Sequence, residues 1–298
     1  MNPKIWIERQ KLHNKVREFF LSRGLLEVDV PMLSATCGTD PQLDYFETLP
    51  PAHYLATSPE FYMKRLLAEG FGDIFSLTHA FRKGETGTKH NCEFNIAEWY
   101  RIGFSAEDLQ QEILDLVNCI TAQNLPLKRT TWEQAFENVD MEKLKAEHKN
   151  WTLEEIEDYA MSAIIEPNLG VVGADLCVCP YYAEFIVDYP PKRAALAKIR
   201  KNSMGQEVAC RFELYINGIE LCNGYEELTD AKEQRKRFLE DIEKRKKMGK
   251  PIPKIDENFL TALEKGMPEC SGVALGLDRL YMLALGKNDI GDVLLFRG

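Results

Sequence analysis

Residues 81–100, FRKGETGTKHNCEFNIAEWY, predict a β-hairpin around which the rest of the chain can be arranged. The stretch follows the apolar run DIFSLTHAF and begins with a loop of charged residues and glycines. A returning strand would place Phe94, Ile96, Glu98 and Tyr100 on one face, because its side chains alternate with period two. A carboxylate on a buried face needs a partner. Glu98 therefore predicts a functional pocket, with a structural ion pair as the alternative.

The preceding segments predict a helix, a strand and a second helix. Apolar residues recur at helical spacing over residues 12–20, and Gly24 would end that helix. LLEVDVP at 25–31 alternates and predicts a strand that ends at its proline. The second helix follows, with Ser58 as its N-cap and Pro59 as its first helical residue.

A second hairpin is predicted in RFELYINGIELCNGYEEL, residues 211–228, because Asn-Gly lies between two alternating runs. This register pairs Glu213 with Cys222 and Tyr215 with Glu220, and puts all four on one face. The two glutamates are then diagonal neighbours, about 7–8 Å apart at the backbone. Two such carboxylates can bind one Mg²⁺ whose remaining ligands are phosphate oxygens. The alternative is a solvated sheet face.

The remaining segments predict further helices and strands. Residues 105–124 and 229–249 predict an amphipathic helix and a charged surface helix, and residues 128–175 a mostly helical surface segment without identifiable chemistry. DLCVCPYYAEFIVDYP at 175–190 predicts one or two strands. ECSGVALGLDRLYMLALG at 269–286 predicts a strand, a turn at Gly276 and a helix with Arg279 in its first turn.

Composition narrows the class of protein. The 298 residues, 45% of them hydrophobic, suffice for one large core, and we expect a single domain over residues 1–298. A net charge of −10 disfavours broad binding to a nucleic-acid backbone. We expect no signal peptide and no membrane span. The eight cysteines form no CxxC pair, which favours reduced thiols in the cytoplasm over a zinc site.

In order and spacing these stretches resemble the catalytic domain of class II aminoacyl-tRNA synthetases, and within that class the lysyl branch. The first helix and strand are similar to motif 1, which builds a dimer interface. Residues 82–100 resemble motif 2, and GVALGLDRL at 272–280 resembles motif 3. The hairpin at 211–230 is similar to the metal and substrate hairpin of the lysyl branch, as are SPEFYMKRL and EWY. The resemblance covers about residues 5–295 and implies an α+β fold, an antiparallel sheet flanked by helices, in a homodimer.

A lysyl-tRNA synthetase would carry an anticodon-binding domain before this region, whereas here the motif 1 helix begins almost at Met1. The EWYR and GMPxCSGVALGxDRL segments are therefore most similar to a truncated paralogous family, the elongation factor P–(R)-β-lysine ligases. That resemblance implies activation of (R)-β-lysine, or lysine, with ATP and Mg²⁺. It also implies transfer to a lysine side chain of elongation factor P rather than to tRNA.

The resemblance also implies roles at the nucleotide. Attack of an amino-acid carboxylate on the α-phosphorus of ATP needs positioning and charge neutralisation, not a general base. Arg82 and Arg279 are the implied catalytic residues: Arg82 would bridge carboxylate and phosphate, while Phe94 and Arg279 would enclose the adenine. Glu213 and Glu220 would hold the metal. The other positions implied to contact or border ATP are Lys83, Gly84, Glu85, His90, Asn91, Leu221 and Gly276.

The positions implied to bind the amino acid are Ser58, Glu60, Glu98, Tyr100, Asn223, Glu227 and Ala274. Of these, Ser58 and Glu60 match positions that meet an amino group near the carboxylate. Tyr100 and Glu227 match positions that recognise the terminal ammonium. Carboxylates at both ends of a pocket suit a diamino acid, since each desolvated ammonium needs a partner.

Two positions depart from the pattern of tRNA-charging lysyl enzymes. Motif 2 usually reads Arg-x-Glu, but here Gly84 stands at the third place and Glu85 follows it. We expect the glycine to re-aim Glu85, the alternative being a lost adenine contact. Ala274 replaces a glycine. Its methyl group could change which lysine isomer fits by about 1–3 kcal/mol.

Three other functions remain open from the sequence. The chain could charge tRNA or a tRNA-like molecule. It could be an amide-forming synthetase of the asparagine type, although Tyr100 and Glu227 suit an ammonium better than an aspartate side chain. It could also be a catalytically inactive binding paralogue. The presence of the expected site residues argues against this: Arg82, Glu213, Glu220 and Arg279.

Overall fold

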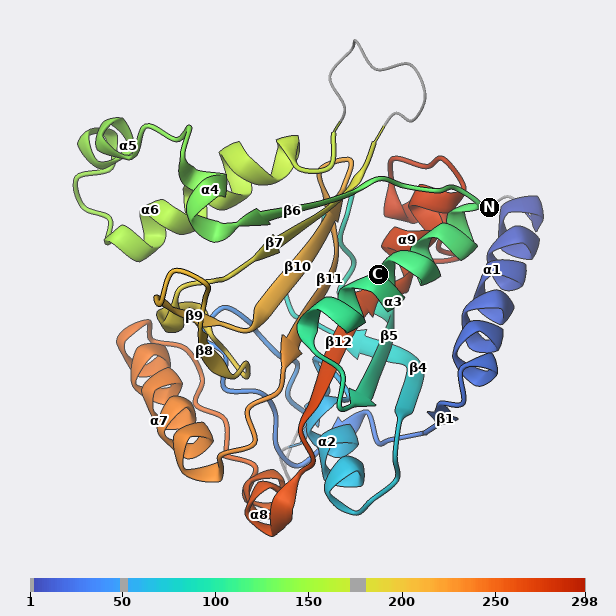
Figure 1. Cartoon of the computed structure of the whole chain (residues 1–298), viewed down its shortest axis with the longest axis horizontal. Helices are drawn as coiled ribbons and strands as arrows, with labels where there is room; N and C mark the ends of the chain where they lie inside the picture. The colour runs from blue at the N-terminus through green and yellow to red at the C-terminus, as the bar shows by residue number, and fades with distance from the viewer. Residues whose placement is uncertain (1–2, 49–52, 172–180, 298) are drawn as a thin grey trace.

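An eight-stranded sheet forms the centre of the chain (Figure 1), whose computed structural model describes residues 3–48, 53–171 and 181–297. In order across the sheet the strands are β1 (Leu26–Glu27), β4 (Ile74–Phe81), β5 (Glu93–Ile102), β12 (Cys270–Gly276), β11 (Ile219–Glu226), β10 (Arg211–Ile216), β7 (Ala183–Val187) and β6 (Leu127–Thr131). The strands from β4 to β7 pair antiparallel, whereas β1 and β6 pair parallel with their neighbours. The predicted α+β fold is confirmed, with an antiparallel centre and parallel edges.

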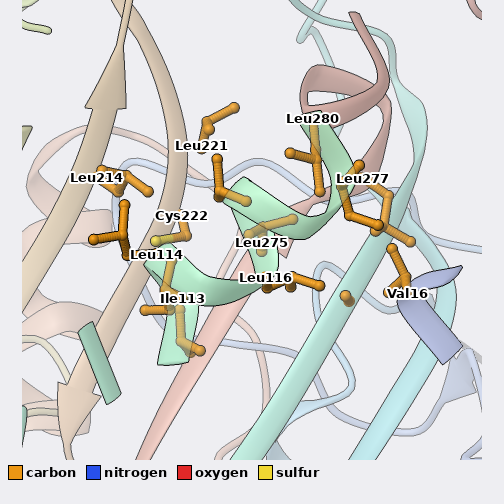
Figure 2. Close-up of a cluster of buried hydrophobic side chains, with 14 of the residues drawn as sticks. Val16, Ile113, Leu114, Leu116, Leu214, Leu221, Cys222, Leu275, Leu277 and Leu280 are labelled. Atoms are coloured by element: carbon orange, nitrogen blue, oxygen red, sulfur yellow. The ribbon is translucent and has the colours of Figure 1, made fainter. Parts of the chain in front are cut away.

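Three helices cover one face of the sheet and enclose the main hydrophobic core: α1 (Pro3–Ser22), α3 (Ala106–Thr121) and α9 (Leu277–Ala284). Figure 2 shows part of this core, in which Leu116 of α3 and Leu277 of α9 belong to the same buried cluster as Leu275 of the sheet. Ser105 caps α3, because its hydroxyl accepts from the amide of Asp108 at 3.1 Å. These contacts bury one face of the sheet against the three helices.

The opposite face of the sheet carries a second apolar cluster, formed by α2 (Glu60–Ala68), α7 (Ala231–Lys247) and α8 (Glu257–Gly266). Phe61 stacks on Phe259 with the ring centroids 4.8 Å apart, and Phe238 packs against both. Tyr100 of β5 belongs to this cluster, whereas its neighbour Trp99 lies in the main core. The predicted alternation of β5 is confirmed.

The α7 helix is more than the surface helix expected from its charge. Its Arg245 is fully buried and donates to the backbone carbonyls of Asp40, Leu43 and Pro251 at 2.7–2.9 Å. The expectation of a purely solvated helix is therefore wrong at this residue. The arginine attaches to α7 a loop that borders the cleft described below.

A helical arm extends past the edge strand β6 (Figure 1), consisting of α4 (Trp132–Phe136), α5 (Met141–Glu147) and α6 (Leu153–Ala160). It continues through a π-helical turn, η1 (Met161–Ile165), and a 3₁₀ turn, η2 (Glu166–Asn168). The predicted helical character of 128–175 is confirmed for this arm but wrong at β6. The shorter elements are β2 (Leu33–Ser34), β3 (Tyr54–Leu55), β8 (Ile199–Lys201), β9 (Glu207–Ala209), η3 (Pro191–Arg193) and η4 (Ile290–Asp292).

Several predicted boundaries shift. The first helix ends before Gly24, whose φ of +79° is the left-handed conformation expected of a helix-ending glycine. The strand expected at 25–31 is only Leu26–Glu27. Val28 and Val30, which follow it, pack on the second apolar cluster, and the Val28 amide still donates to the Phe75 carbonyl at 2.8 Å. Helix α2 begins at Glu60, whose amide donates to Ser58 Oγ at 3.1 Å.

Cysteines 177 and 179 lie outside the described residues. None of the described helices is both long and apolar enough to cross a membrane.

Gly224 gives a test of how tightly the sheet packs on the core. A Cβ built there would lie 2.3 Å from the Phe212 ring and 3.0 Å from the carbonyl of Gly272. We expect Gly224→Ala to lower the free energy of unfolding by about 1–3 kcal/mol, because both neighbours are held by the core. Urea denaturation measures this. Gly38→Ala is the control, since its nearest neighbour would be 4.0 Å away, and equal stability of the two variants would contradict the packing.

Candidate active site

A cleft of about 1030 Å³ opens on the sheet face opposite the main core, at the upper end of the range for small-molecule sites. Its floor is made by β5, β12, β11 and β10, and its walls by α2, α7, the loop at 36–43 and the end of the helical arm. The predicted site residues that line it are Ser58, Glu60, Arg82, Glu85, His90, Asn91, Phe94, Glu98, Tyr100, Glu213, Glu220, Leu221, Asn223, Glu227, Ala274, Gly276 and Arg279. Lys83 and Gly84 are not among the lining residues, and the Lys83 amide donates instead to the Asp44 carbonyl at 2.9 Å.

The register of the sheet arranges part of this set in a row. Glu98 pairs with Ala274, Ala274 with Asn223, and Asn223 with Glu213. Directly opposed residues of antiparallel strands share a face and lie about 4.5–5.5 Å apart. Four adjacent strands therefore present one side chain each to the cleft, with a carboxylate at either end of the row.

The register of the second hairpin differs from the prediction in one residue. Glu213 pairs with Asn223 and not with Cys222, because an irregularity between Leu214 and Tyr215 leaves Leu221 as an extra residue. The bulge turns Cys222 toward the main core, where it is 2% exposed. The predicted placement of Cys222 beside the glutamates is therefore wrong. The pairing of Tyr215 with Glu220 is confirmed.

The two carboxylates predicted to hold a metal are not equivalent. Glu213 is 8% exposed and accepts from Arg211 and from the hydroxyls of Tyr189 and Tyr215, at 2.7 and 2.6 Å. Burial would raise its pKa, but Arg211 and the hydroxyls outweigh burial and lower it. Glu220, with 37% of its side chain exposed, turns toward the cleft.

This donor set fits a magnesium ion that takes most of its ligands from phosphate and water. Glu220 would supply a direct ligand, and Glu213 would exchange one of its hydrogen bonds to supply another. Within the described residues no three acidic, His or Cys side chains already converge as a complete site.

A third carboxylate, Glu166, approaches from the helical arm, where no chemistry was expected. Its Oε1 lies 3.4 Å from the Tyr215 hydroxyl. Burial, with Glu220 and Glu213 nearby, raises the pKa of Glu166 to about 7. The arm is held in place by Glu184, which accepts from the Gly170 amide at 2.9 Å. No local pattern marks Glu166, because the contact joins segments far apart in the chain.

Arg82 and Arg279 line the cleft near the loop that joins β4 and β5. The Arg82 guanidinium lies 5.1 Å from the centre of the Phe94 ring and 3.7 Å from Glu85, and its Nε has no hydrogen bond in the described chain. Gly84 has φ +85°, so it makes the turn that brings Glu85 into the cleft. Arg279 donates to the carbonyls of Lys89 and Glu220, at 3.1 and 2.7 Å. That Glu85 takes over the adenine contact stays a prediction.

Two further groups face the same end of the cleft. Asn91 donates to the Glu93 carbonyl at 2.6 Å, while its own carbonyl oxygen, buried, has no partner among the described residues. Burial and Arg279 lower the pKa of His90, which favours the neutral imidazole. A polar ligand in the cleft could form hydrogen bonds with these unpaired groups, since buried polar atoms are normally hydrogen-bonded.

At the other end, Glu98 is 1% exposed and accepts from Ser58 Oγ at 2.6 Å and from the Tyr100 hydroxyl at 2.8 Å. Its hydrogen-bond partners are hydroxyl groups, and no described residue forms the structural ion pair that was considered from the sequence. Burial and the nearby Glu60 raise the pKa of Glu98 to about 8. The carboxylate is thus placed to gain from a cationic ligand.

Lys64 is the residue that sequence reasoning missed here. Its ammonium lies 2.6 Å from both Glu60 and Glu227. The carboxylates expected at opposite ends of the amino-acid pocket are thus neighbours that share one lysine. The i, i+4 spacing of Glu60 and Lys64 on α2 could have indicated the first contact. Nothing local could have indicated Glu227.

Fold and site together define a class II synthetase catalytic domain. Residues 2–297 match the family described as tRNA synthetases class II (D, K and N), and the chain belongs to this family. It is 43% identical to the elongation factor P–(R)-β-lysine ligase of Proteus mirabilis (strain HI4320), 41% to that of Pasteurella multocida (strain Pm70) and 40% to that of Vibrio atlanticus (strain LGP32). Each comparison covers 97% of this chain and 94% of the relative.

The raised pKa of Glu98 predicts a pH-dependent effect of Glu98→Gln on stability. Because the pKa rises from 4.5 to about 8 on folding, the ionised carboxylate opposes folding, and stability falls as the pH rises through this interval. The glutamine variant lacks this dependence. We expect its melting temperature to exceed that of the parent by a margin that grows to a few degrees by pH 8.

Thermal unfolding between pH 5 and 9 measures the margin. Glu133→Gln, at an exposed glutamate on α4, is the control and should show no such trend. A margin independent of pH would contradict the buried carboxylate.

Proposed function

We propose that the chain is an ATP-dependent ligase that activates (R)-β-lysine, or lysine, and transfers it to a lysine side chain of elongation factor P. The names of its relatives point to this reaction, and one feature of the cleft carries it. Arg82 and Arg279 line the cleft beside Phe94 and Glu220. Glu60 and Glu227 form a separate group around Lys64, and Glu60 is close enough to raise the pKa of Glu98. Such a cleft suits a molecule that is anionic at one end and carries ammonium groups at the other.

In the first step, a carboxylate oxygen of the amino acid would attack the α-phosphorus of ATP, and the bond to the bridging oxygen would break as pyrophosphate leaves. Arg82 lines the cleft and its Nε has no hydrogen bond within the described residues, so its planar donors could hold carboxylate and phosphate together. Arg279 would stabilise the nucleotide, and Phe94 would lie against the adenine. Mg²⁺, held through Glu220 and Glu213, would neutralise phosphate charge.

In the second step, the uncharged amine of an acceptor lysine would attack the adenylate carbonyl. The amide bond would form, the bond from carbon to phosphate oxygen would break, and AMP would leave with its electron pair. The attacking nitrogen would lose one proton, which the departing phosphate or solvent would take up. The cleft is also lined by three exposed lysines, Lys192, Lys244 and Lys247. The acceptor would enter past them.

We further propose a homodimer in the cytoplasm. Ile7 and Leu21 lie on one side of α1, since fourteen residues make four turns, and both are more than half exposed at 55% and 51%. Leu26 and Leu33 add further exposed apolar surface after the helix. The six cysteines of the described residues are free, which fits a reducing compartment.

Sedimentation tests the dimer. We expect the parent chain to sediment as a dimer and Leu21→Glu to dissociate more readily, because a charge in an apolar interface is costly. Leu153→Glu, at an equally exposed leucine on the helical arm, is the control. A monomeric parent chain would contradict the proposal.

Pyrophosphate exchange tests the activation step. We expect exchange with lysine and stronger exchange with (R)-β-lysine, and formation of a modified elongation factor P when that protein is added. Arg82→Lys should lower exchange at least about 100-fold, because a point charge cannot replace the planar donors. ATP binding should persist.

Two results would contradict the proposal. Absence of exchange with every lysine isomer would remove the activation step. Formation of aminoacyl-tRNA on acid gels, without modification of elongation factor P, would favour the alternative of a synthetase that acts on tRNA or a tRNA-like acceptor.

A further inference from the structure

Lys64 is a buried cation behind the wall of the cleft, and neither the predicted roles nor the proposed mechanism uses it. Its side chain is 1% exposed, and it is not among the cleft-lining residues. The ammonium lies 2.6 Å from Glu60 Oε1 on α2 and 2.6 Å from Glu227 Oε2 after β11. Burial would lower the pKa of Lys64, but the two carboxylates outweigh burial and raise it, so it is charged at neutral pH.

Each of the two carboxylates turns one oxygen to Lys64: Glu60 accepts a hydrogen bond from it, and Glu227 forms a close ion pair with it. Neither accepts a hydrogen bond from another side chain of the described residues, and Glu227 Oε2 has no hydrogen bond within them. The second oxygen of Glu227 lies over Gly272, where an added Cβ would be 2.5 Å from it and 2.3 Å from the Tyr100 ring. Glu227 therefore reaches the cleft beside Tyr100 only because residue 272 is a glycine. Lys64 holds both carboxylates from behind and leaves one oxygen of each for a ligand.

The charges of this pocket can be counted. In the empty pocket burial raises the pKa of Glu98 to about 8 and that of Glu227 to about 7, so both are partly protonated at neutral pH. A bound ammonium group favours their ionised forms. With Glu60, Glu98 and Glu227 all ionised, they carry three formal negative charges, and Lys64 carries one positive charge. Two negative charges remain. A substrate with two ammonium groups neutralises them, while its own carboxylate faces Arg82. A substrate with one ammonium leaves a buried carboxylate unpaired, which is strongly unfavourable.

We propose that Lys64 is a positioning and specificity-determining residue, which fixes Glu60 and Glu227 and sets the pocket charge to match two ammonium groups. This inference rests on the proposed function in taking a diamino acid as the substrate. Lys64 touches neither substrate nor nucleotide. It acts through the two carboxylates.

Lys64→Met removes the charge and retains the length of the side chain. We expect the KM for the diamino acid in pyrophosphate exchange to rise about 10- to 100-fold. Without Lys64 the two carboxylates lose the cation that fixes them, and their mutual repulsion favours the protonated forms, which bind an ammonium group weakly. The KM for ATP should stay within about twofold and kcat within about threefold, since the interaction concerns only substrate binding. Lys265→Met is the matched control, since Lys265 is 60% exposed and pairs with Glu69.

A second variant separates charge from packing. Lys64→Met combined with Glu60→Gln restores the formal charge of −2, so we expect it to bind the diamino acid more tightly than Lys64→Met alone. If Lys64 only fills space, the second substitution adds to the damage. Weaker binding by the double variant, or an unchanged KM in Lys64→Met, would overturn the proposal. So would an equal rise in the KM for ATP, which would indicate a general disturbance of the fold.

Calorimetry with pentane-1,5-diamine keeps this test separate from the proposed function. The probe has two ammonium groups and no carboxylate, so its binding needs no chemical step. We expect the parent chain to bind pentane-1,5-diamine at least 10-fold more tightly than it binds butylamine. We also expect the parent chain to bind pentane-1,5-diamine at least 10-fold more tightly than Lys64→Met does. If the parent shows no exchange but this order holds, the proposed reaction fails and the role of Lys64 stands. Equal binding by parent and Lys64→Met would overturn that role.

Discussion

The register of four antiparallel strands is the constraint on which the site depends. Glu98, Ala274, Asn223 and Glu213 occupy one row only because β5, β12, β11 and β10 pair as they do. A slip of one residue in any strand would exchange the cleft side chains for core leucines and valines. The core under α1, α3 and α9 therefore does more than stabilise the fold. By holding residues such as Trp99 and Leu275 at full burial, it makes the alternative registers unfavourable.

The bulge at Leu221 shows how that constraint is reconciled with the chemistry. Both Leu221 and Cys222 enter the core cluster, so β11 buries two consecutive side chains at this point. A regular strand cannot do this, and the extra residue restores the alternation for Asn223 and beyond. As a result Glu220 faces the cleft near Glu213 while Asn223 joins the row beside Ala274. Tyr189 and Tyr215 then satisfy the buried Glu213.

Much of this arrangement is encoded locally and could be predicted. Alternation in 93–102 identified the cleft face of β5, and Asn217-Gly218 identified the turn between β10 and β11. The bulge could not be predicted, because a single extra apolar residue looks the same in sequence whether it pairs or not. Glu166 and the contact of Lys64 with Glu227 also escaped, since both join segments brought together only by the tertiary fold. The resemblance placed the lining residues but not their mutual contacts.

The shared lysine changes how selectivity in this cleft should be understood. Two carboxylates at separate ends would recognise two ammoniums independently, whereas Glu60 and Glu227 compete for one buried cation and are coupled to each other. Selectivity then depends on total charge as well as on length. Ala274 adds a steric term, because its methyl group lies in the sheet between Glu98 and Asn223. The charge of the pocket would not distinguish one diamino acid from another. Lysine isomers would therefore be distinguished by shape, and one methyl group can contribute about 1–3 kcal/mol to such a difference in binding.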